Sequence, residues 1–188
     1  MRMSEGPRTL LSMRPARPLA LLMLLALAAP LSACAGSHDA RAWASQVCRT
    51  LAPWRTEIAS LTTRTQQQMT SRTTPGQAKE NLMTLFGGAR DASEKARAGV
   101  AEASAPDVKG GRRIADGFVA SLAEMRDAYG KARTGIGGLA IAPSEGFYDQ
   151  VAHVVTQLNQ DYQASSLDTS NLKSTELQEA FDDVPECR

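Results

Sequence analysis

Apolar side chains recur every three or four residues through four long segments of this chain, and that spacing limits what it can fold into. Positions three and four apart lie on one face of an α-helix. The segments are residues 43–69, 78–103, 108–136 and 147–162. No stretch of useful length shows the strict alternation of a half-buried strand. The sequence therefore predicts an all-α fold, an antiparallel four-helix bundle with a short fifth helix over about residues 175–183.

Local signals predict where several helices begin, end or bend. Thr74, Pro75 and Gln77 form the pattern of a capping box with proline at the first helical position, so the second helix should begin there. Pro53 lies inside the first apolar pattern, and a proline in a helix interior removes a hydrogen bond and crowds the preceding turn. The sequence predicts a kink or break just before it. Pro185 is expected to end the fifth helix.

The periodicity also predicts which face of each helix is buried. The second helix should bury a face rich in alanine, formed by Ala78, Leu82, Leu85, Ala89, Ala92, Ala96, Val100 and Ala103, with Phe86 beside it. The third helix has the most regular spacing, through Val108, Gly111, Ala115, Phe118, Leu122, Met125, Tyr129, Ala132 and Ile136. Gly87 and Gly88 weaken the second helix, by roughly 1 kcal/mol per glycine relative to alanine.

The N-terminal residues have the three parts of an export signal. Arg2, Arg8, Arg14 and Arg17 give it a positive start, and an uninterrupted apolar run follows over residues 19–29. As a helix that run is about 16 Å long, which is too short for a hydrocarbon core of roughly 30 Å. We therefore expect a cleaved signal and not a transmembrane helix.

The sequence Leu31-Ser32-Ala33-Cys34 follows this run and resembles the lipobox of bacterial lipoproteins. In that family the cysteine thiol receives a diacylglycerol, and cleavage leaves the cysteine as the first mature residue. The resemblance implies lipidation of Cys34 and a protein anchored on the extracytoplasmic face of the cell membrane. Two acyl chains, such as palmitate, give a stable anchor where one is marginal. The alternative is ordinary secretory cleavage that leaves Cys34 unmodified.

The chain is thus predicted to contain a cleaved signal peptide (1–33), a short linker from the lipidated cysteine (34–39) and a helical bundle domain (40–188). Asp39 can cap the first helix, and so short a linker would keep the domain close to the membrane. The part after residue 33 carries 17 basic and 19 acidic residues. This balance argues against a nucleic-acid partner and against a basic patch for membrane surfaces.

Cys48 and Cys187 remain once Cys34 is assigned to the lipid. An even pair in an exported protein predicts a disulfide, and two free thiols are the alternative. The bond would close a loop of nearly the whole mature chain, worth about 5 kcal/mol in the chain-entropy model. An even number of long antiparallel helices returns the chain to its starting end, where the two cysteines can meet. The first and third interhelical loops are then expected at the opposite end.

Neither a catalytic set nor a metal or cofactor site can be recognised in the sequence. The only histidines, His38 and His153, stand in no nucleophile motif, and the cysteine pair lacks metal-ligand spacing. We therefore expect no enzyme activity and no cofactor. Trp43 and Trp54 are candidate ligand-binding residues, although packing in the core is the simpler interpretation.

The apolar, glycine-rich stretch 134–143 is predicted at the end of the bundle away from the cysteine pair. Apolar loops on a rigid scaffold are candidate contact surfaces. The alternative is a long interhelical turn in which Leu139 and Ile141 cap the core.

The full chain resembles the small secreted lipoproteins of actinobacteria. The resemblance rests on the lipobox, the segment Cys-Arg-Thr-Leu-Ala-Pro-Trp at residues 48–54 and the C-terminal Val-Pro-Glu-Cys at residues 184–187. That family has no characterised activity. The resemblance therefore implies a location, an all-helical fold, lipid on Cys34 and a Cys48–Cys187 pairing.

These observations predict a non-enzymatic, lipid-anchored module that binds or scaffolds a cell-envelope component. The alternative is a carrier of a lipid or a small apolar ligand, held in a pocket between helices near Trp43, Trp54 and the alanine-rich face. An envelope hydrolase is a third possibility, but it would need a pair of catalytic carboxylates, and none can be recognised in the sequence. The expected partners are the membrane, through the lipid, and an envelope protein or apolar ligand.

Overall fold

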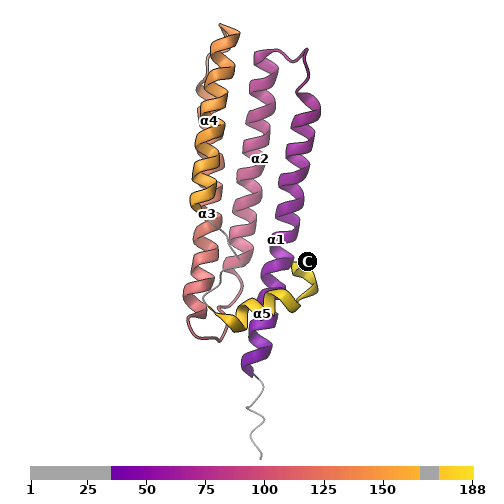
Figure 1. The fold of residues 1–188 in the computed structure, drawn as a ribbon, viewed down its shortest axis with the longest axis vertical. Helices are drawn as coiled ribbons and strands as arrows, with labels where there is room; N and C mark the ends of the chain where they lie inside the picture. The colour runs from indigo at the N-terminus through magenta and orange to yellow at the C-terminus, as the bar shows by residue number, and fades with distance from the viewer. Residues whose placement is uncertain (1–34, 166–173) are drawn as a thin grey trace, which may run out of the picture. The chain divides into compact units, whose positions relative to one another are not determined.

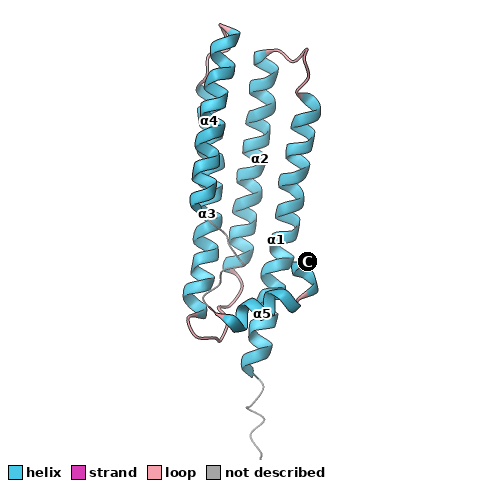
Figure 2. Ribbon diagram, in the orientation of Figure 1, coloured by secondary structure: helices cyan, strands magenta, loops and turns pink. Residues whose placement is uncertain are grey.

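The computed structural model of the chain describes residues 35–165 and 174–188, and every regular element in those ranges is helical (Figure 2). In order they are α1 (Ala35–Gln68), α2 (Pro75–Ala101), α3 (Gly111–Gly138), α4 (Ser144–Ser165), α5 (Thr175–Asp183) and the 3₁₀ turn η2 (Pro185–Cys187). The predicted all-α class is therefore confirmed. Within the same ranges, no helix combines the length and apolar character needed to cross a membrane.

The four long helices pack side by side, and α5 with η2 lies against the N-terminal half of α1 (Figure 1). The most extensive packing joins α2 to α3, while α1 packs on α2 and α4 packs on α3. Short loops join α1 to α2, α2 to α3 and α3 to α4, so consecutive helices are antiparallel. This confirms a helical bundle with a short C-terminal helix. Helix α4 covers α3 without forming a packed pair with α1 in the part of the chain described.

Two hydrogen bonds link the first turns of α2 to the α3–α4 loop and the first turns of α4 to the α1–α2 loop. The ammonium of Lys79 donates to the carbonyl oxygen of Leu139 at 2.8 Å, and the hydroxyl of Tyr148 donates to the carbonyl oxygen of Thr73 at 3.4 Å. Helix α5, which precedes Cys187, lies at the other end of α1 (Figure 1). The two loops therefore meet at the end away from the cysteine pair, as the helix count predicts.

The capping box predicted at the start of α2 is present. The hydroxyl of Thr74 accepts a hydrogen bond from the backbone N–H of Gln77, and the Gln77 side chain accepts one from the backbone N–H of Thr74 at 3.0 Å. Pro75 occupies the first helical position. Helix α5 also has the predicted bounds, because the hydroxyl of Ser174 caps its start and Pro185 follows its end.

Helix α1 differs from the prediction at two places. It begins at Ala35, so residues 35–39 are helical where the sequence predicts a linker capped by Asp39. Residues 36–39 have weak intrinsic helix propensity, but extending an existing helix is easier than nucleating a new one. The helix also continues through Pro53, so of the predicted kink or break the break is wrong, and the kink stays a prediction. Pro53 lies on the exposed face, as does Arg49, whose carbonyl loses its helical partner and can bond to water instead.

The predicted buried faces of α2 and α3 need small corrections. In α2, Phe86 is buried and Leu85 is half-buried, the reverse of the prediction. In α3, Ala128 is buried where Tyr129 was expected, and Val108 precedes the helix. A repeat of 3.6 residues allows a buried stripe to pass through either of two adjacent positions. The neighbouring helix decides between them.

The buried apolar side chains form two clusters at different levels of the bundle. The proximal core lies near the N-terminus of α1 and draws on four helices, α1, α2, α3 and α5. The distal core lies near the two loops and is formed by α2, α3 and α4. The proximal core includes Trp43, Val47, Leu51, Phe118, Leu122, Leu177 and Phe181, and the distal core has Leu82, Phe86, Ala132 and Ile136 at its centre.

Candidate functional site

The described residues provide no cluster suited to metal binding. No group of three or more His, Cys, Asp or Glu that could hold an ion lies within residues 35–165 and 174–188. The acidic C-terminal residues bind α1 instead: Asp183 forms an ion pair with Arg41, and Glu186 accepts a hydrogen bond from the hydroxyl of Ser45 at 3.1 Å. These contacts fasten the end of the chain to the first helix.

The two predicted cysteine sites have different outcomes. Cys34 lies outside the described residues. The sulfur atoms of Cys48 and Cys187 are 2.06 Å apart, which is disulfide-bonding distance, and their Cα atoms are 5.0 Å apart. The bond links η2 to α1, and Cys48 is buried in the proximal core. It thus adds a covalent tie to the polar contacts that hold the C-terminus.

Trp43 packs in the proximal core among aromatic rings. Its ring meets those of Phe118 and Phe181 edge to face, at centroid distances of 5.4 Å and 5.8 Å, and the two phenylalanine rings are parallel to each other. Only 2% of Trp43 is exposed, and its indole N–H has no hydrogen-bond partner. The residue fills space between α1, α3 and α5 and does not line the groove described below.

Trp54 is also buried, but its polar atom is satisfied. The indole N–H donates to the hydroxyl of Ser93 at 3.0 Å, and that hydroxyl donates to the carbonyl oxygen of Ala89 at 2.9 Å. Ser93 is fully buried on the alanine-rich face of α2. Both tryptophans therefore pack in the core, in line with the simpler of the two sequence interpretations.

The candidate contact stretch is divided between a helix and a loop. Residues 134–138 continue α3, and the loop proper is residues 139–143. Leu139 packs against the distal core, whereas Ile141 is 51% exposed. Tyr148, on the first turns of α4, is 42% exposed. We refer to the loop 139–143 together with Tyr148 as the distal tip.

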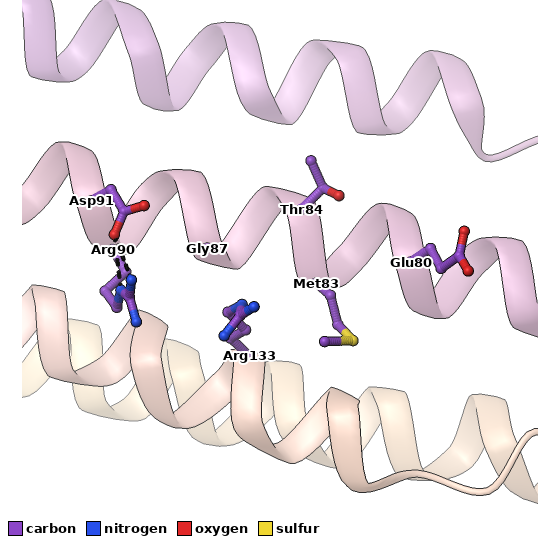
Figure 3. Close-up of a pocket in the computed structure, with 7 residues that line it drawn as sticks. All are labelled: Glu80, Met83, Thr84, Gly87, Arg90, Asp91 and Arg133. Carbon is purple, nitrogen blue, oxygen red and sulfur yellow. Dashed lines mark hydrogen bonds and ion pairs between the residues drawn. The ribbon is translucent and has the colours of Figure 1, made fainter.

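A groove of about 450 Å³ runs along the surface between α2 and α3 (Figure 3). It is lined by Glu80, Met83, Thr84, Gly87, Arg90 and Asp91 from α2 and by Arg133 from α3. Glycines at positions 87 and 137 leave space for the side chains of Arg133 and Met83. A Cβ added at Gly87 would lie 3.2 Å from Nε of Arg133, and one added at Gly137 would lie 3.6 Å from Met83. The sequence prediction missed this groove, and its only signal was glycine inside two helical patterns.

Charged side chains bridge the same two helices next to the groove. Glu94 of α2 accepts hydrogen bonds from Arg97 at 2.6 Å and from Arg126 of α3 at 2.9 Å. The hydrogen bond from Arg97, followed by that from Arg126, lowers the pKa of Glu94 from 4.5 to about 2. Arg126 also pairs with Asp127 at 2.7 Å. These contacts keep Glu94 ionised and join α2 to α3.

Comparison of the chain with protein-family models, with curated proteins and with solved structures found no match in any of the three.

Proposed function

We propose that the protein is a lipid-anchored, non-enzymatic module on the extracytoplasmic face of the membrane, which contacts another envelope component through its distal tip. The supporting observation is the position of the tip. Cys34 directly precedes the start of α1, and the tip lies at the other end of the bundle. A 34-residue helix is about 51 Å long. A lipid at Cys34 would therefore hold one end of the bundle at the membrane and leave the tip free.

The composition of the tip supports a role in contact. Ile141 and Tyr148 are two of the three most exposed large apolar side chains in the described residues. Apolar side chains on a loop held by packed helices are suited to bind another protein. Tyr148 also has a hydroxyl that bonds to Thr73, so the α1–α2 loop supports the same surface.

The alternative of an apolar carrier gains no specific support. Trp43 and Trp54 are packed in the proximal core, and the groove between α2 and α3 is open and lined by charged residues. A carrier site for a lipid is usually a concave and mainly apolar cavity. We therefore retain the contact module as the proposed function.

Native mass spectrometry of protein extracted gently from its own membrane tests the anchor and the partner together. We expect a mature mass that begins at Cys34 and includes diacylglycerol, accompanied by a protein partner. The variant Ile141→Asp should lose the partner and keep the lipid, and Thr63→Asp, at an exposed position on α1, is the matched control. An unlipidated mass would contradict the anchor, and a partner retained by Ile141→Asp would contradict the role of the tip.

A further inference from the structure

Arg133 differs from the other arginines along the seam between α2 and α3. Arg90 pairs with Asp91 at 2.7 Å, Arg97 pairs with Glu94, and Arg126 pairs with Glu94 and Asp127. Arg133 has no ion pair or hydrogen-bond partner among the described residues, and it lies between Arg90 and Met83 in the groove (Figure 3). Its guanidinium is therefore a free cation with all its donors available.

Gly87 allows the Arg133 side chain to lie across the surface of α2. A Cβ at position 87 would come within 3.2 Å of Nε and 3.3 Å of Cδ of Arg133, closer than side chains normally approach. Glycine inside a helix destabilises it relative to alanine, so its presence here has a cost. The absence of a Cβ at position 87 leaves the space in which the Arg133 side chain lies.

The rest of the groove suggests the size and character of what would bind there. A volume of about 450 Å³ falls within the usual range for small-ligand sites. Met83 offers an apolar surface next to Arg133, and Glu80 offers a carboxylate beyond it (Figure 3). The charge of Arg90 is already compensated by Asp91. Arg133 is thus the position in the groove where a negative group gains most.

We infer that the groove between α2 and α3 binds an oxyanion, the carboxylate or phosphate group of a small ligand, through the guanidinium of Arg133. Guanidinium matches both anions through two parallel hydrogen bonds. The apolar part of the ligand lies over Met83, and an amino group, where the ligand has one, lies toward Glu80. This site is separate from the distal tip and does not depend on the lipid anchor.

The test is a titration of the isotope-labelled, disulfide-bonded full chain with acetate and, separately, with inorganic phosphate at constant ionic strength. Chemical shifts of the Gly87 amide and the Arg133 Nε–H report binding. We expect the shifts to saturate with anion concentration. The affinity should fall by about tenfold or more in Arg133→Gln, as for loss of a charge-assisted hydrogen-bond pair. Tighter binding of acetate would identify a carboxylate ligand, and tighter binding of phosphate a phosphate ligand.

Two glycine variants separate a built site from a general surface charge. Gly87→Ala should weaken binding because its Cβ displaces Arg133. Gly130→Ala, on the other wall, should bind like the parent because its Cβ meets Arg90 at an ordinary 3.7 Å. Arg133 is exposed, so Arg133→Gln should fold normally. If a glycine variant unfolds, the Arg133→Gln variant still tests the site. Binding unchanged in Arg133→Gln, or shifts that never saturate and appear equally at Arg55, would overturn the inference.

Discussion

The proximal and distal cores lie between the same two central helices, yet they are closed in different ways. In the proximal core α5 packs on α1, three aromatic rings meet, and the Cys48–Cys187 bond ties the C-terminal turn to α1. In the distal core α4 supplies Val151, Val154, Val155 and Leu158, all of which are only half-buried. The proximal end is thus closed by a short helix and a disulfide, whereas at the distal end α4 buries Phe147 fully and the rest of its apolar face only in part.

This contrast agrees with the proposed function, in which one end of the bundle is anchored and the other contacts a partner. Binding surfaces are commonly drawn from the parts of a protein that open at low cost in free energy. The distal tip belongs to the less covered end, whereas the end that would face the membrane has the larger core and the covalent tie. We therefore expect substitutions in the two cores to have unequal effects on stability.

The largest effect should come from Phe118, at the centre of the proximal aromatic group. Phe118→Ala removes contacts with Trp43 and Phe181 and should lower the free energy of unfolding by about 3–5 kcal/mol. The distal variant Leu158→Ala should cost less, because that side chain is smaller and only half-buried. Urea denaturation of both variants measures the difference. Equal losses would contradict the distinction between the two cores.

Removal of the disulfide should have the next largest effect. The double variant Cys48→Ala/Cys187→Ala should lose about 2–5 kcal/mol of unfolding free energy, because the loop it opens spans 139 residues. A nine-residue helix such as α5 is too short to be stable alone, so it should lose amide protection first. Chemical denaturation with and without a reducing agent provides the check on the parent chain. If hydrogen exchange showed an equal loss of amide protection in α4 and α5, the disulfide would not act on the proximal end alone.

Ser93 should show a smaller, specific effect on the proximal core. Ser93→Ala leaves the buried indole N–H of Trp54 without a partner, which costs about 1–3 kcal/mol. In the background Trp54→Phe the same substitution should cost much less, because the indole N–H that needs a partner is no longer present. A double-mutant cycle measured by thermal unfolding tests this. Equal costs in both backgrounds would show that the hydroxyl acts through packing alone.

The smallest expected effect concerns pH and the ion pairs between the two cores. Because the pKa of Glu94 falls from 4.5 to about 2 on folding, its contribution to stability is present above pH 4.5 and is lost as the pH falls through 2. In Glu94→Gln this part of the acid dependence should be absent. Urea midpoints measured between pH 5 and 2 compare the two proteins. Parallel curves would mean that the exposed network contributes nothing, as some surface ion pairs do.

The fold was predictable wherever short-range chemistry decided it. The capping box at Thr74 and the stop at Pro185 fixed helix ends because each acts within one turn. Most of the buried face of α3 followed from spacing, although the choice between Ala128 and Tyr129 did not. Pro53 was misjudged because its effect depends on whether its face meets the core or water, which the local sequence does not reveal.

The candidate sites were less predictable, because they depend on residues from different helices. Ser93 reads as an interruption of an alanine-rich face until Trp54 of α1 is placed beside it. Gly87 reads as a weak point in a helix until Arg133 of α3 lies across it. Such pairings require the register between two helices, and a single sequence does not supply it. The cysteine pair was the exception, since two residues admit only one intramolecular pairing.

Native-state hydrogen exchange, followed residue by residue in the disulfide-bonded chain, tests the contrast between the two ends most directly. We expect amides around Val47 in α1 and Leu122 in α3 to exchange only through global unfolding. Amides of α4 after Phe147 should exchange through a partial opening of lower free energy, because Phe147 is fully buried whereas Val151, Val154, Val155 and Leu158 are only half-buried. Protection of α4 equal to that of the proximal core would contradict this picture and show that the bundle opens as one unit.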